Sequence, residues 1–167
     1  MTAEEIRRYL AELDLELRYL NIKGEVSIYG GAVMCLVYDA RPSTKDVDAV
    51  FRPTSEIRKA IARIAERNSL PSDWLNDGVK GYLVEHPRRI LIDLPNLKVF
   101  VPEPDYLLAM KTLSARADTF DQADVRILIG ELGLSSPDDV FKIVEKYYPR
   151  HQIKPATQYF IEELFKK

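Results

Sequence analysis

A strand, a glycine pair, a short helix and a second strand follow one another early in the chain, and this order constrains the fold more than any other feature. Residues 26–29 are mostly apolar and predict a short buried strand that runs directly into Gly30-Gly31. Residues 32–38 predict a short helix, which a polar, turn-rich loop connects to a second strand over residues 46–51. We expect both strands in one mixed sheet, with the glycine pair at the mouth of its cleft.

The second strand carries two aspartates, Asp46 and Asp48, on either side of the apolar Val47. Because side chains alternate along a strand, both carboxylates are expected on the same face of the sheet. Carboxylates that close repel each other, and a divalent cation resolves the conflict. Mg²⁺ commonly takes one or two carboxylates together with substrate phosphates and water. The alternative is a surface strand with exposed acids, and an Asp-x-Asp triplet alone does not distinguish the two.

Gly30-Gly31 lies where a predicted strand ends and a predicted helix begins. Glycines at such a position let a phosphate approach the backbone, and a helix N-terminus offers unpaired N–H donors. A Gly-Gly pair alone is a common turn. Upstream of Arg41, Thr44 and the two aspartates, it becomes part of a composite pattern.

Apolar residues at helical spacing predict further helices on both sides of this stretch. A helix over residues 3–20 begins with the capping-box pattern of Thr2 and Glu5, and another helix follows Pro53. Residues 71–83 are ambiguous, with another short helix as one interpretation. Two strands are predicted over residues 89–94 and 97–101, and helices are predicted near residues 104–116, 119–132, 137–147 and 156–166.

This order of elements predicts an α+β fold with a small mixed sheet flanked by helices and a helical C-terminal third. We expect residues 1–101 to form the core. Residues 102–167 are expected to pack on it as a helical region that completes the cleft, so that the chain forms one compact unit.

The composite pattern resembles the nucleotidyltransferase superfamily, which has the polymerase-beta-like fold. The signature of that superfamily is an apolar residue, Gly, then Gly or Ser, a short helix, and an acid–apolar–acid triplet on the next strand. The matching stretches here are YGG and DVDAV. The finer form R-x-x-T-x-D-x-D, from Arg41 to Asp48, resembles the branch that contains the AbiEii-type toxins and uncharacterised relatives.

The C-terminal part extends this resemblance, which covers about residues 24–132. The stretch PDYLLAMK, which ends at Lys111, resembles the lysine-bearing helix of that branch. Arg116, Asp121 and Asp124 resemble the start of its following helix.

The resemblance implies transfer of a nucleotidyl group from an NTP to an acceptor hydroxyl or phosphate, with Mg²⁺ or Mn²⁺ as cofactor. It implies Asp46 and Asp48 as catalytic metal ligands and a third acid on a later strand, for which Asp93 is the candidate; the alternative is a strand-end acid that faces water. Gly30, Gly31, Arg41, Thr44 and Lys111 are the implied nucleotide-binding residues, and Lys111 is also implied in catalysis.

Two alternatives concern the helical region. Lys111 projects from the apolar side of its predicted helix, where it either reaches a triphosphate or extends its amine to the solvent at the edge. Asp121 and Asp124 either orient Lys111 or Arg116 or contact the region of the metal and acceptor, or they are acids that favour the positive N-terminus of a helix.

Composition limits the remaining choices. The chain has 24 basic and 26 acidic residues, a net charge of −2, which argues against a broadly basic nucleic-acid-binding surface. A single cysteine excludes an intrachain disulfide, and with two histidines it cannot form a closed zinc site. Neither a signal peptide nor a membrane-length apolar run is recognisable, so we expect a cytoplasmic protein without a membrane partner.

Three functions are compatible with these features. The leading one is a nucleotidyltransferase, the toxin of a toxin–antitoxin pair, which acts on an RNA such as tRNA and has a cognate antitoxin as partner. The second is a non-catalytic binding or antitoxin-like protein of the same fold, which the acidic balance slightly favours because RNA enzymes usually carry more positive charge. The third is transfer to a small molecule, as in antibiotic-modifying members of the superfamily.

Overall fold

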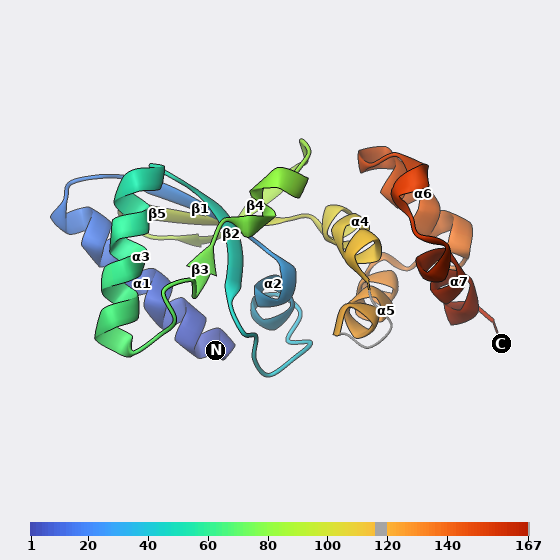
Figure 1. Cartoon of the computed structure of the whole chain (residues 1–167), viewed down its shortest axis with the longest axis horizontal. Helices are drawn as coiled ribbons and strands as arrows, with labels where there is room; N and C mark the ends of the chain where they lie inside the picture. The colour runs from blue at the N-terminus through green and yellow to red at the C-terminus, as the bar shows by residue number, and fades with distance from the viewer. Residues whose placement is uncertain (116–119, 167) are drawn as a thin grey trace. The chain divides into compact units, whose positions relative to one another are not determined.

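Figure 1 shows the computed structural model of the chain, which describes residues 1–115 and 120–166. The chain divides into two compact units: residues 1–83 with 88–101, here the sheet unit, and residues 84–87 with the region from Pro102 onward, here the helical unit. The boundary expected between residues 101 and 102 falls at this division. A single compact unit with a shared cleft stays a prediction.

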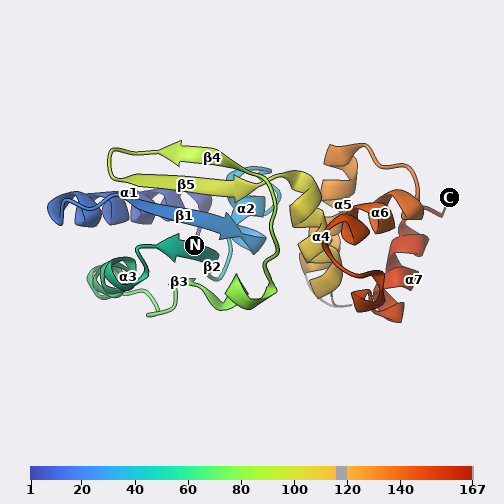
Figure 2. The ribbon, with the colours of Figure 1, turned by 90° about the horizontal axis from the view of Figure 1, so that it is seen from above.

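The sheet unit contains a five-stranded mixed sheet with the strand order β3-β2-β1-β5-β4. The central strand β1 pairs antiparallel with β2 and parallel with β5, while β2 pairs parallel with β3. Figure 2 shows β4 at the edge of the sheet, running antiparallel to β5. The α+β class with a small mixed sheet is therefore confirmed. The strands are β1 (Gly24–Tyr29), β2 (Val47–Arg52), β3 (Leu75–Asn76), β4 (Arg88–Asp93) and β5 (Leu97–Pro102).

Three helices, α1 (Ala3–Tyr19), α2 (Gly30–Leu36) and α3 (Thr54–Asn68), belong to the same unit. The predicted capping box of α1 is present: Glu5 N–H donates to Thr2 Oγ1 and Thr2 N–H donates to Glu5 Oε1, each at 3.1 Å. Apolar residues at helical spacing in α1 and α3, and at alternate positions in β1 and β2, are fully buried. They include Leu10, Leu13, Leu17, Ile57, Ile64, Val26, Ile28, Val47 and Ala49.

Residues 71–83 contain the two-residue strand β3 and the 3₁₀ helix η1 (Gly78–Tyr82). A strand this short cannot show an alternating pattern, which is why the sequence does not predict it. Trp74 anchors the segment: its side chain is buried, and its indole N–H donates to the Ile61 carbonyl of α3 at 3.1 Å. Its ring also meets Tyr9 of α1 edge-on, with ring centroids 5.5 Å apart.

The helical unit contains α4 (Pro104–Ser114), α5 (Phe120–Leu132), α6 (Pro137–Tyr147), η2 (Arg150–Gln152) and α7 (Pro155–Leu164). The four predicted helices are confirmed to within two residues at each end. Prolines in the first turn begin α4, α6 and α7, where the missing N–H costs nothing. No helix within the described residues combines the length and apolar character needed to cross a membrane.

Asp105, in the first turn of α4, links this helix to α6. Its Oδ2 accepts hydrogen bonds from Lys146 Nζ at 3.0 Å and Tyr147 OH at 2.8 Å, and its Oδ1 accepts one from the Tyr106 N–H at 2.7 Å. Partial burial of the carboxyl group acts to raise its pKa. The three hydrogen bonds outweigh this effect and hold the pKa of Asp105 below its ordinary value.

These contacts predict a pH-dependent effect of Asp105→Asn. Because the pKa of Asp105 is lower in the folded state, its ionised carboxylate stabilises the fold at pH values above the unfolded-state pKa, about 3.9. This stabilisation is lost as the pH falls through the folded-state pKa. We expect a cost of about 1–2 kcal/mol at neutral pH and almost none at a pH below the folded-state value. Hydrogen exchange in α4 and α6 at both pH values measures this, and an equal cost at both would contradict the assignment.

Candidate functional site

The glycine pair and the aspartates meet at one end of the β1–β2 strand pair. Tyr29, the last residue of β1, is directly opposite Asp48 of β2, and Gly30 follows Tyr29 in the chain. Asp46 lies one residue before β2 begins. Antiparallel pairing therefore brings together the two halves of the sequence pattern, as expected.

Gly30 leaves room for the Asp48 carboxylate. The φ angle of Gly30 is +66°, in the left-handed region that favours glycine, and a Cβ atom added there would lie 2.9 Å from Asp48 Oδ2. Backbone conformation and close packing thus both favour glycine at this position.

Gly31 lies against Arg41 and Thr44. A Cβ atom at Gly31 would be 2.8 Å from Arg41 Nη1 and 2.9 Å from Thr44 Oγ1. Thr44 Oγ1 also donates to the Asp46 carbonyl at 3.3 Å, and its N–H donates to the Met1 carbonyl at 2.9 Å. The loop before β2 is therefore folded back onto the glycine pair, and three residues of the motif, Arg41, Thr44 and Asp48, lie against it.

Burial around the aspartates follows the alternation expected of a strand. Val47 and Ala49 are fully buried, whereas Asp46 and Asp48 are half-buried. Both residues are thus partly exposed to solvent, as residues that bind a hydrated cation and a substrate must be.

Sequence reasoning did not single out Arg88, yet it lies on the same face of the sheet as Asp48. The strand register puts Ser27 and Tyr29 on one face of β1, with Asp48 beside Tyr29. Arg88 Nη1 donates to Ser27 Oγ at 2.7 Å, and its guanidinium lies 3.8 Å from the centroid of the Phe100 ring. This contact depends on the order of β1, β5 and β4, which no local pattern reveals.

The proposal of Asp93 as the third metal ligand is wrong. Asp93 is exposed at the end of β4, where the Leu94 N–H donates to the Leu97 carbonyl, and Leu97 is opposite Gly24 at the start of β1. Asp48 lies beside Tyr29, at the other end of β1. The two ends of β1 are about 16 Å apart, at about 3.3 Å per residue. Because β4 runs antiparallel to β5, its final residue lies at the wrong end of the sheet.

In the helical unit, Lys111 is held by both predicted partners. Its Nζ lies 2.8 Å from Asp121 Oδ1 and 2.9 Å from Asp124 Oδ2. Lys111 is 7% exposed and Asp124 is 2% exposed, so the lysine does not extend to the solvent. The ion pairs agree with the interpretation in which the aspartates orient Lys111. The other proposed partner, Arg116, lies outside the described residues.

The predicted residues thus form two groups, one in each unit. The first contains Gly30, Gly31, Arg41, Thr44, Asp46 and Asp48, and the second contains Lys111, Asp121 and Asp124. A cleft shared by the two groups stays a prediction. Within the described ranges, no three or more His, Cys, Asp or Glu side chains are grouped as metal ligands.

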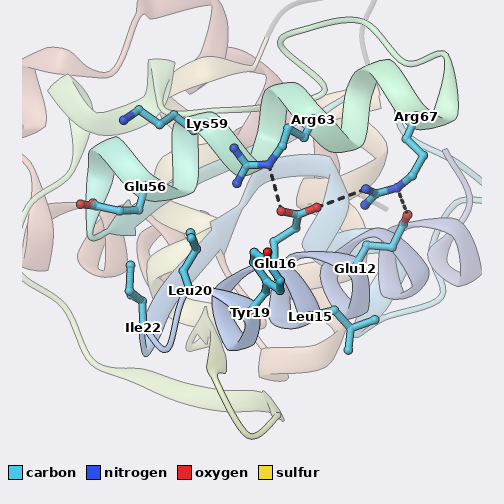
Figure 3. Close-up of a pocket in the computed structure, with 10 residues that line it drawn as sticks. All are labelled: Glu12, Leu15, Glu16, Tyr19, Leu20, Ile22, Glu56, Lys59, Arg63 and Arg67. Atoms are coloured by element: carbon cyan, nitrogen blue, oxygen red, sulfur yellow. Dashed lines mark hydrogen bonds and ion pairs between the residues drawn. The ribbon is translucent and has the colours of Figure 1, made fainter.

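A separate surface hollow of about 890 Å³ lies between α1 and α3 (Figure 3) and contains no residue of either group. Four of its six charged side chains bind one another: Arg63 donates to Glu16, and Arg67 donates to both Glu12 and Glu16, at 2.9–3.1 Å. Partial burial opposes the effect, but the two arginines keep the pKa of Glu16 below its ordinary value. These pairs join two helices and leave little uncompensated charge for a ligand.

No family model matches the chain, and comparisons with curated proteins and with solved structures found no match.

The glycine geometry predicts that Gly30→Ala destabilises the sheet unit by at least about 1–2 kcal/mol, because an L-residue in the left-handed region costs that much before Asp48 is displaced. Gly81→Ala is the matched control, since a Cβ atom there meets nothing within 4 Å. Urea unfolding followed by fluorescence of the single tryptophan, Trp74, compares the two. Equal effects of both substitutions would contradict the assigned role of Gly30.

Proposed function

We propose that the chain is a metal-dependent nucleotidyltransferase that moves a nucleotidyl group from an NTP to an acceptor hydroxyl or phosphate. The observation that carries the proposal is the packing around the glycine pair: Asp48 lies against Gly30, and Arg41 and Thr44 lie against Gly31. Each part of the site has a task in phosphoryl chemistry, which depends mainly on positioning and charge neutralisation.

Asp46 and Asp48 fit a divalent cation. They are half-buried, lie two residues apart at the start of β2, and supply the hard carboxylate oxygens that Mg²⁺ or Mn²⁺ prefers. A bound cation would neutralise phosphate charge and activate the acceptor oxygen. With Asp93 excluded, substrate phosphates and water must complete the coordination, and we expect metal binding to be weak until a nucleotide is present.

Arg41, Thr44 and the Gly31 backbone fit a triphosphate. The Arg41 guanidinium offers charged N–H donors in a planar fork, and the Thr44 hydroxyl is held nearby. The absence of a side chain at residue 31 lets both groups approach the main chain. In this proposal they orient the phosphates beside Asp48. A role of Lys111 at the phosphates stays a prediction of the family resemblance, because its amine is already paired with Asp121 and Asp124.

Calorimetric titration with a non-hydrolysable NTP, with and without Mg²⁺, tests the site. We expect binding that requires the cation and that falls at least about tenfold in Asp48→Asn. Equal binding by the wild type and Asp48→Asn would exclude these aspartates as the metal site. Transfer of a radiolabel from each NTP to total RNA then tests the reaction, and tRNA as acceptor and an antitoxin as partner are predictions of the family resemblance.

A non-catalytic nucleotide-binding protein is the second candidate, and the position of Asp93 favours it, because only two of the three expected acids lie at the site. The same experiments distinguish the two candidates. Cation-dependent nucleotide binding without transfer under any NTP, with Mg²⁺ or Mn²⁺, would support the non-catalytic protein.

A further inference from the structure

The outer strand β4 has the length and charge order needed to pair with itself. It forms one edge of the sheet with six residues, whereas β3 at the other edge has only two (Figure 2). A strand at a sheet edge presents unpaired N–H and C=O groups that can pair with another chain. Within the described residues, β5 is the one strand that pairs with β4.

The backbone direction along β4 identifies which residues face outward. The Leu94 N–H donates to the Leu97 carbonyl, so residue 94 points its backbone groups toward the β5 side. Along an antiparallel strand these groups alternate between its two sides. The backbone groups of Arg89, Leu91 and Asp93 therefore point away from the sheet.

We propose that two copies of this chain associate through antiparallel pairing of their β4 strands, which joins their sheets into one. The pairing is centred on Leu91, which faces Leu91 of the second copy. In this register each Arg89 faces Asp93 of the second copy, and all three outward residues exchange backbone hydrogen bonds with their opposite residues.

Charge and apolar contact both favour this register. Arg89 and Asp93 are exposed and carry opposite charges on the same strand face as Leu91, so the two-fold axis creates two oppositely charged pairs. On the other face, Ile90 would meet Ile92 of the second copy, and Ile90 is 50% exposed in the single chain. A register centred on Ile90 would instead place Arg89 opposite an apolar leucine.

Charge exchange tests the pairing, independently of the proposed function. Sedimentation equilibrium over a range of protein concentrations gives the dimer dissociation constant of the wild type, Arg89→Asp, Asp93→Arg and the double variant with both changes. Each single change puts like charges opposite each other twice, so we expect at least about a tenfold higher dissociation constant. The double variant restores opposite charges and should return to within about threefold of the wild type.

Arg7→Asp is the matched control, because Arg7 is an exposed arginine on α1 and its replacement changes the net charge equally. It should leave the dissociation constant unchanged, and circular dichroism establishes that every variant is folded. A monomeric wild type at all concentrations would overturn the proposal. So would a dimer that neither single change weakens, or a double variant no better than the single ones.

Discussion

Asp48→Asn is expected to lower nucleotide transfer by at least about a hundredfold while leaving the stability of the sheet unit almost unchanged. Asparagine has nearly the same shape but lacks the charge that binds a cation and, through it, neutralises the transferring phosphate. The side chain is half-buried beside Gly30, so replacing a carboxylate by an amide of the same size should not disturb the packing around Gly30. Label transfer from NTPs to total RNA measures activity, and Trp74 fluorescence in urea measures stability.

Asp93→Asn provides the control for this experiment. It makes the same chemical change in the same sheet, but at the opposite end of β1 from Asp48. It should leave transfer within about twofold of the wild type, since an exposed aspartate far from the site adds little to the local potential. An equal loss in Asp48→Asn and Asp93→Asn would show that the active site lies elsewhere, as would transfer that survives Asp48→Asn.

The part of the site that the sequence predicts is the part formed by neighbouring elements. Gly30 and Asp48 come together because β1 and β2 are connected by one short helix and a loop, and their spacing limits how the strands can pair. Lys111 and Asp124 are likewise on consecutive helices, and their helical spacing places both beside a buried stripe. Local patterns are sufficient in both cases.

Asp93, which the sequence misplaces, and Arg88, which it misses, both depend on strand pairings that local sequence patterns do not encode. The strand that carries Asp93 was predicted correctly, but the end of the sheet that it occupies depends on the direction of β4 beside β5. The contact between Arg88 and Ser27 requires the same strand order. Period-two alternation predicts which face a residue occupies but not its position along the neighbouring strand.

The buried ion pairs of the helical unit predict the largest loss of stability. Lys111→Met keeps a long, unbranched side chain but removes the cation between Asp121 and Asp124. We expect a cost of about 3–5 kcal/mol, because Asp124, 2% exposed, is left as a buried carboxylate without its counter-charge. Hydrogen exchange in α4 and α5 measures this separately from the sheet unit, which Trp74 fluorescence reports.

Two further variants distinguish the cost of leaving the Asp124 carboxylate unpaired from the cost of losing a lysine side chain. Lys146→Met removes a lysine whose side chain is 60% exposed and paired with Asp105, so it should cost less than about 1 kcal/mol. In Lys111→Met/Asp124→Leu the buried carboxylate is also removed, and most of the lost stability should return because apolar side chains can replace a buried ion pair. If this double variant is stable but inactive, Lys111 acts on the nucleotide as well as on the fold. If it is stable and fully active, the lysine and its aspartates serve the helical unit alone, and the chemistry belongs to the residues around Gly30 and Asp48.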